Sequence, residues 1–121
     1  MKRSMMQVYI KNSDKAVQFY QNVFGAKVLI DARHENGTVA HAELDIFGQV
    51  FAICETLETE SITGNAMQFC LHFGDGKEEL VKNIIEKLSD GGMFTYHDST
   101  DWSPLMAGII DKFGVNWCIF V

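Results

Sequence analysis

The 121-residue sequence has one proline and three cysteines, and both small numbers limit what the chain can be. A single proline together with 47% hydrophobic residues argues against an intrinsically disordered chain. Cys54, Cys70 and Cys118 are odd in number, form no C-x-x-C pair and each lie in an apolar segment. We therefore interpret them as buried, reduced thiols and not as a disulfide framework or a zinc site.

The sequence also lacks long apolar runs and basic clusters. No stretch approaches the roughly 20 apolar residues of a membrane span, and Gln7 and Lys11 follow the charged start too closely for a signal peptide. We therefore expect a cytoplasmic protein without a membrane partner. The net charge of −6 and the lack of a Lys/Arg cluster argue against binding to nucleic acid.

The first half of the chain has the pattern of a strand, a helix and three further strands. Asn12, Ser13 and Asp14 suit a helix start because each has a side-chain oxygen that can accept an unpaired N–H. Apolar residues then recur at helical spacing until Gly25, which can take the left-handed conformation that ends a helix. Alternating segments predict strands at residues 5–11, 27–33, 38–46 and 49–56, the last two joined by a turn at Phe47-Gly48.

The second half repeats this order. Asp75 and Glu78 have the spacing of a capping box at the start of a helix over residues 76–89. Strands are predicted at residues 68–73, 93–97, 105–111 and 115–121, and a polar loop containing Trp102 at 98–104. The pattern predicts an α+β fold in one domain, residues 1–121, with module 1 over about 4–56, a linker at 57–65 and module 2 over about 66–121.

Three segments carry a resemblance to a known family: FYQNVFGAKV at residues 19–28, HAEL at 41–44 and DKFGVNW at 111–117, with Trp102 ahead of the last. Together they resemble the vicinal oxygen chelate (glyoxalase/bleomycin resistance/dioxygenase) superfamily, in particular its PhnB-like branch. The resemblance implies two βαβββ modules whose mixed sheets curl into partial barrels. It also implies a small-molecule ligand held on the inner faces of the sheets, and a homodimer.

Metal-dependent members of this superfamily place His, Gln or Glu ligands on inward positions of the first and last strands of each module. The resemblance puts these positions at Met5, Ala52, Gln68 and Cys118. Methionine is a soft, neutral ligand and alanine is none, whereas divalent metals in such sites prefer imidazole and carboxylate. We therefore expect no tightly bound metal and no other cofactor.

Three polar residues are candidates for catalysis. His41 and Glu43 share one face of a strand and could supply a base or two metal ligands, or they could form an ordinary solvated or hydrogen-bonded sheet face. His72 alternates with Gln68 and Cys70 and could act as an acid or base, or it could be a satisfied histidine at the rim of the core.

The functional prediction is a PhnB-like small-molecule-binding protein with no assigned activity. The alternatives are a divalent-metal-dependent lyase or transferase of the glyoxalase type, with ligands from His41, Glu43, Gln68 and His72, and an antibiotic-sequestering protein. Trp102 is expected to cover the mouth of the ligand pocket, or else to pack in a dimer interface. The residues expected to line the pocket are Met5, Gln7, Tyr9, Gln68, Cys70, His72, Trp102, Cys118 and Phe120.

Overall fold

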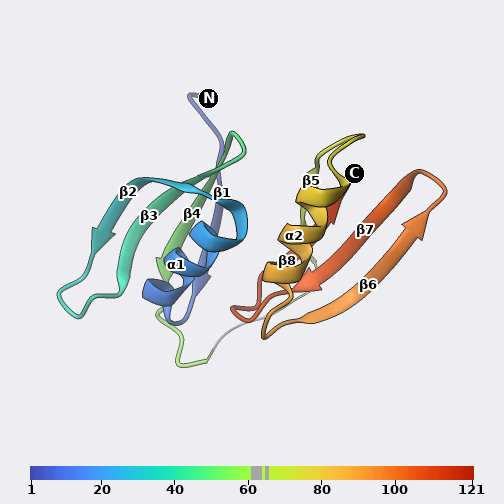
Figure 1. The fold of residues 1–121 in the computed structure, drawn as a ribbon. Helices are drawn as coiled ribbons and strands as arrows, with labels where there is room; N and C mark the ends of the chain where they lie inside the picture. The colour runs from blue at the N-terminus through green and yellow to red at the C-terminus, as the bar shows by residue number, and fades with distance from the viewer. Residues whose placement is uncertain (61–63, 65) are drawn as a thin grey trace. The chain divides into compact units, whose positions relative to one another are not determined.

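The computed structural model describes residues 1–60, 64 and 66–121 and divides the chain into two compact units, residues 1–62 and 63–121. Each unit contains one helix and one curled four-stranded mixed sheet (Figure 1). The α+β class and the order of elements predicted from the sequence are thus confirmed. Among the helices of the described residues, none has the length and apolar character needed to cross a membrane.

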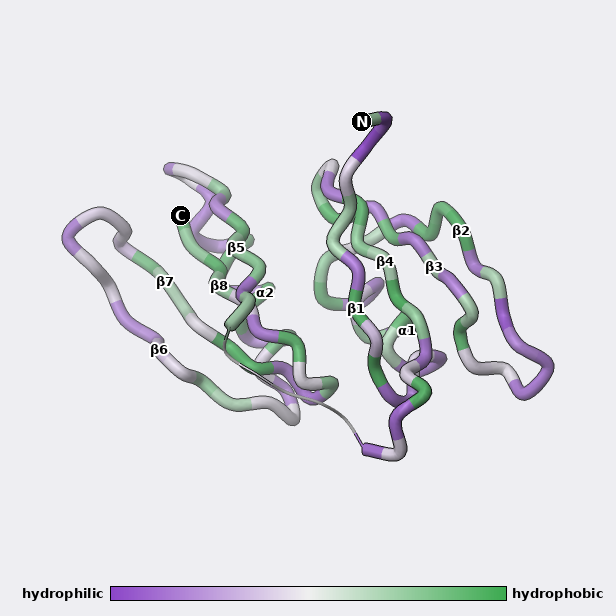
Figure 2. The backbone as a smooth tube through the Cα atoms, turned by 180° about the vertical axis from the view of Figure 1, so that it is seen from behind, coloured by the Kyte–Doolittle hydropathy of each residue, from purple (hydrophilic) through white to green (hydrophobic). Residues whose placement is uncertain are grey.

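The first unit has the strand order β1-β4-β3-β2, in which β1 runs parallel to β4 and the other neighbours are antiparallel. Figure 2 shows the polar turn that joins β2 to β3 and the more apolar path of β4, most of which is buried. The elements are β1 (Met6–Ile10), α1 (Ser13–Phe24), β2 (Lys27–Arg33), β3 (Val39–Ile46) and β4 (Gln49–Glu55).

The core of the first unit lies between α1 and one face of its sheet. Tyr20 of α1 is fully buried and meets the ring of Phe51 edge-on, with ring centroids 4.9 Å apart. Phe51 and Ile53 face α1, so their neighbour Ala52 points to the opposite face, as does Cys54. This alternation separates the apolar core from the side chains available for function.

The start of α1 corrects one prediction. Asn12 is the N-cap, but it has a φ of 56° and makes no side-chain capping bond. Glu55 at the end of β4 supplies the acceptor instead: its carboxylate takes the N–H of Ser13 at 2.9 Å and that of Asn12 at 3.3 Å. The Ser13 hydroxyl accepts the backbone N–H of Val39 at 2.8 Å, so it serves to tie the helix to β3.

The second unit has the equivalent strand order β5-β8-β7-β6, with β5 parallel to β8. Its helix begins at Glu78, and Lys77 is the N-cap without a side-chain capping bond, so the capping box predicted at Asp75 and Glu78 does not form. The elements are β5 (Phe69–His72), α2 (Glu78–Leu88), β6 (Met93–Thr100), β7 (Ser103–Ile110) and β8 (Asn116–Phe120).

The predicted loop over residues 98–104 is wrong, because most of it is a hairpin. β6 continues to Thr100, β7 starts at Ser103, and the two residues pair across a turn formed by Asp101 and Trp102. The polar side chains of this segment bond to the backbone of the hairpin. The hydroxyl of Thr100 accepts the N–H of Ser103 at 2.9 Å, and the buried Ser103 hydroxyl donates to the carbonyl of Val121 at 2.7 Å.

Two of the edge strands, β2 and β6, are irregular in the same way. The pairing of β2 with β3 shifts between Val28 and Ile30 and again between Ala32 and Arg33. The pairing of β6 with β7 likewise shifts at two places, between residues 94 and 96 and between 98 and 100. Such bulges bend a strand and increase its twist, which fits the curl of both sheets.

Candidate functional site

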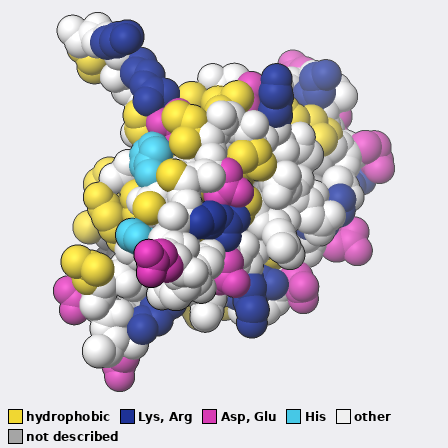
Figure 3. All heavy atoms as spheres, turned by 90° about the vertical axis from the view of Figure 1, so that its left-hand side faces the viewer, with side chains coloured by type: hydrophobic (Ala, Val, Ile, Leu, Met, Phe, Trp, Pro, Cys, Tyr) yellow, Lys and Arg dark blue, Asp and Glu magenta, His cyan; other side chains and the backbone are white. Residues whose placement is uncertain are grey.

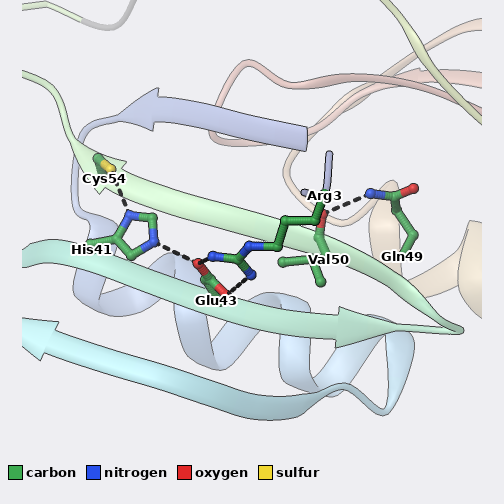
Figure 4. A network of polar contacts seen from close by, with 6 residues as sticks. All are labelled: Arg3, His41, Glu43, Gln49, Val50 and Cys54. Atoms are coloured by element: carbon green, nitrogen blue, oxygen red, sulfur yellow. Dashed lines mark hydrogen bonds and ion pairs between the residues drawn. The ribbon is translucent and has the colours of Figure 1, made fainter. Parts of the chain in front are cut away.

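A connected polar network lies on the face of the first sheet that is opposite α1 (Figure 4). Glu43 of β3 is 2% exposed, and its two oxygens accept both terminal nitrogens of Arg3, each at 2.8 Å. The Nε2 atom of His41 lies 2.9 Å from Glu43 Oε1, and its Nδ1 atom lies 3.7 Å from the Sγ atom of Cys54 on β4. The network thereby joins His41 and Glu43 of β3 to Arg3 near the N-terminus and to Cys54 of β4.

The charge state of Glu43 organises this network. The hydrogen bonds from Arg3 and then from His41 lower the pKa of Glu43 from its ordinary 4.5 to about 2, against the effect of burial. Arg3 has a raised pKa because it bonds to Glu43. Since an ionised carboxylate only accepts hydrogen bonds, His41 donates from Nε2, and its Nδ1 is left to face Cys54.

A row of three rings lies in the second unit, on the face of its sheet opposite α2. His72 of β5 stacks on Phe120 of β8 with centroids 4.5 Å apart, and Trp102 meets Phe120 edge-on at 5.4 Å. Trp102 is 63% exposed. The row points away from the core because the neighbouring residues Trp117 and Ile119 of β8 are fully buried on the side of α2.

Three polar or thiol side chains lie beside this row. The amide of Gln68 donates to Asn116 Oδ1 at 3.2 Å and to the carbonyl of Trp117 at 3.3 Å. The prediction that all three cysteines are buried is wrong for Cys70, which is exposed. Its thiol donates to Gln68 Oε1 at 3.8 Å. Cys118 pairs with Cys70 across the parallel strands, and burial, followed by the neighbouring Cys70, raises its pKa to about 11. Cys118 is therefore a protonated, inert thiol near neutral pH.

The DKFGVNW segment, residues 111–117, stabilises the turn between β7 and β8 of the second unit. Asp111 is 3% exposed; its Oδ1 accepts the backbone N–H groups of Phe113 at 2.9 Å and Val115 at 3.1 Å. Its Oδ2 accepts the indole N–H of Trp117 at 2.9 Å. One carboxylate thus closes the turn between β7 and β8 and anchors the strand that carries Cys118 and Phe120.

The predicted pocket residues fall into two groups, one in each unit. Gln7 and Tyr9 pair with Ala52 and Cys54, so they share the face that carries His41 and Glu43; Met5 precedes Gln7 by two residues just before β1. The second group gathers around the ring row and consists of Gln68, Cys70, His72, Trp102, Cys118 and Phe120.

Sequence reasoning missed Arg3 and the role of Cys54. In the sequence, Arg3 belongs to a short, positively charged N-terminal segment. No local pattern links it to Glu43, which is 40 residues away. Cys54 could have been found. The predicted turn at Phe47-Gly48 determines which residues of the two hairpin strands are paired. Counting away from that turn along both strands places Cys54 opposite His41.

The resemblance to the superfamily places its metal ligands at Met5, Ala52, Gln68 and Cys118. Alanine cannot bind a metal and methionine is a poor ligand for a hard divalent ion, so side chains at these positions would not fit such a site. Within residues 1–60, 64 and 66–121, no three His, Cys, Asp or Glu side chains are grouped so that they could hold a metal ion.

Comparison with known proteins agrees with this fold. The family model of the Glyoxalase/Bleomycin resistance protein/Dioxygenase superfamily matches residues 3–119. A PhnB protein from Bacillus cereus superposes with a TM-score of 0.82 at 22% identity, covering 98% of each chain. Protein PA1353 from Pseudomonas aeruginosa also gives 0.82, at 14% identity, over 99% of this chain and 97% of the other.

A fosfomycin resistance protein, FosX from Listeria monocytogenes, is also similar. Its TM-score is 0.71 at 13% identity, over 99% of this chain and 92% of the other. At these identities the structural matches show a shared fold. No curated protein sequence matches the chain.

Proposed function

Because the chain belongs to the glyoxalase/bleomycin resistance protein/dioxygenase superfamily, we propose that it is a PhnB-like protein that binds a small, partly apolar molecule without a tightly bound metal. The two modules inferred from the sequence, residues 4–56 and 66–121, each have a sheet face opposite the helix, and the ligand lies on such a face. The protein works as a cytoplasmic homodimer and binds neither nucleic acid nor membrane.

The observation that carries this proposal is the ring row of His72, Phe120 and Trp102. An indole that is 63% exposed at the end of a hairpin leaves apolar area in water, and burying a large apolar side chain is worth about 1.5–3 kcal/mol. A planar or apolar ligand that covers the row recovers part of this free energy. Gln68 and Cys70 beside the row offer hydrogen-bonding groups that orient the ligand.

Exposed apolar side chains support the dimer. Leu29 and Ile30 of β2 are exposed, as is Met93 of β6, and such side chains are commonly covered in subunit interfaces. On the face shown in Figure 3, hydrophobic side chains lie among both acidic and basic side chains. This mixture, with a net charge of −6, supports a protein partner over a nucleic acid.

The test is a ligand screen with paired substitutions in the second unit. Phe120→Leu removes the central ring of the row. Phe94→Leu is the matched control, because Phe94 stacks on His97 in an equivalent pair, 4.6 Å apart, on the face that carries α2. Compounds found by quenching of Trp102 fluorescence, with Trp102→Phe as the blank, should bind Phe120→Leu at least about tenfold more weakly and Phe94→Leu unchanged.

Two outcomes would contradict the proposal. Equal weakening by Phe120→Leu and Phe94→Leu would show that the row is not the binding surface. A shift of the monomer–dimer equilibrium by Trp102→Phe, with ligand binding measured by calorimetry unchanged, would place Trp102 in the dimer interface instead. The screen includes fosfomycin because a structural neighbour is a fosfomycin resistance protein, and recovery of the bound compound unchanged would distinguish sequestration from turnover.

A further inference from the structure

A second feature, in the first unit, has the arrangement of a nucleophilic centre. Cys54 lies on β4 and His41 on the adjacent antiparallel β3, both on the face opposite α1 (Figure 4). The thiol is 3.7 Å from His41 Nδ1, and the other ring nitrogen is 2.9 Å from the carboxylate of Glu43. A nucleophile, a base within hydrogen-bond reach and a third group that orients the base are the signature of an activated nucleophile.

The hydrogen bonds around His41 determine that a proton moves from the Cys54 thiol to the imidazole. Glu43 is held as a carboxylate by the two bonds from Arg3, so it keeps the Nε2–H tautomer of His41 and directs the lone pair of Nδ1 toward Cys54. Cys54 is only 8% exposed, and this burial raises the pKa of its thiol. The thiol is therefore protonated at rest and needs His41 as its base.

We propose that Cys54, His41 and Glu43 form a nucleophilic triad that adds the Cys54 thiol to an activated alkene, such as an α,β-unsaturated carbonyl compound. His41 Nδ1 takes the thiol proton as Sγ bonds to the β-carbon. The π electrons of the alkene move toward the carbonyl, and His41 returns the proton to the α-carbon. One S–C and one C–H bond form while one S–H bond and one C=C π bond are lost, so no leaving group or oxidant is needed.

The neighbouring strand favours this class of electrophile. Tyr9 of β1 pairs with Cys54 of β4, so the two side chains lie on the same face. The Tyr9 hydroxyl oxygen accepts the amide of Gln7 at 2.9 Å, and the phenolic proton can be donated to the carbonyl oxygen of a bound enone. Such a donor stabilises the negative charge that develops on that oxygen during addition.

The three cysteines of the chain make the test internally controlled. The intact wild-type protein is treated with acrylamide, a weakly reactive alkene, and the labelling of each cysteine is followed by peptide mass spectrometry. Cys70 is exposed and reports the intrinsic reactivity of a thiol, whereas Cys118 is buried and is labelled when the second unit opens. The ratio of the Cys54 rate to the Cys70 rate is the measured quantity.

His41→Gln is expected to lower this ratio about 100-fold, the lower end of the contribution of a general base. Glu43→Gln acts through His41 and lowers the ratio less, and Glu43→Asp restores part of it. His34→Gln is the matched control for His41→Gln and leaves the ratio unchanged, because His34 is exposed in the turn between β2 and β3.

Two results would overturn the triad. In one, Cys54 of the folded wild-type protein is not labelled while Cys70 is. In the other, His41→Gln lowers the ratio by less than about tenfold. Far-UV circular dichroism of each variant confirms that the chain keeps its secondary structure during labelling, so that a lower Cys54 rate reports the loss of the base. Ligand binding to the ring row is independent of either result.

Discussion

Replacement of Asp111 by asparagine tests the central contact of the turn before β8. The carboxylate accepts three hydrogen bonds, two through Oδ1 and one through Oδ2. In Asp111→Asn the amide oxygen can still accept the N–H groups of Phe113 and Val115. The new NH₂ group then faces the indole N–H of Trp117, and two buried donors meet without an acceptor between them.

The expected loss follows from those two donors. Leaving a buried donor unsatisfied costs about 1–3 kcal/mol, so the indole N–H and one amide N–H together should lower the free energy of unfolding by about 2–6 kcal/mol. This is a large share of the 5–15 kcal/mol typical of a domain. For a chain of this length, each kcal/mol corresponds to about 3–6 °C in melting temperature, and we expect a decrease of at least about 6 °C.

The assay is thermal and urea unfolding of four proteins: wild type, Asp111→Asn, Trp117→Phe and the double variant. Without the indole N–H, the asparagine has no donor to oppose, so Asp111→Asn should cost about 1–3 kcal/mol less in the Trp117→Phe background. Additivity within about 0.5 kcal/mol would refute the reasoning. So would an Asp111→Asn protein that melts within about 2 °C of wild type.

Three further outcomes are expected. Protein purified without a metal-binding tag and dialysed should contain well under one equivalent of zinc, nickel, manganese or iron by elemental analysis; near-stoichiometric metal lost on replacing His72 or Glu43 would contradict this. Light scattering at tens of micromolar should give twice the 13.6 kDa chain mass, and a monomer mass would exclude the dimer. Because the pKa of Glu43 is lowered to about 2, its ionised form stabilises the fold above its ordinary pKa of 4.5, and this stabilisation is lost as pH falls toward 2. Urea unfolding at pH 5 and pH 3 should therefore show a larger loss for wild type than for Glu43→Gln, and equal losses would be inconsistent with the lowered pKa.

Helices and strands whose apolar residues recur at a regular spacing could be predicted from the sequence. The apolar spacing of both helices and the alternation along β3 and β4 are local signals, and they were sufficient for the α+β class. The β6–β7 hairpin was missed because Asp98, Thr100 and Ser103 have the composition of a loop. Their side chains instead bond within the hairpin and the adjoining backbone, so polarity alone did not distinguish an exposed strand pair from a connection.

Contacts between distant parts of the chain explain the other differences. Glu55 caps a helix that starts 42 residues earlier. Asn12 and Ser13 are residue types that often cap helices, but their side chains do not cap this one. Arg3 pairs with Glu43 across 40 residues. No local pattern encodes such a pair, since it depends on the curvature of the finished sheet. By contrast, the proximity of His41 and Cys54 follows from turn position and strand register alone.

The bulges in β2 and β6 bear on how the protein avoids aggregation. These strands lie at the outer edge of their sheets and carry exposed apolar side chains such as Leu29 and Met93, a combination that invites another strand to add on. Each edge is interrupted by two register shifts, which misalign its free N–H and C=O groups for a straight incoming strand. The bulges are therefore expected to oppose sheet extension, and a substitution that regularised either strand should increase the tendency of the protein to aggregate.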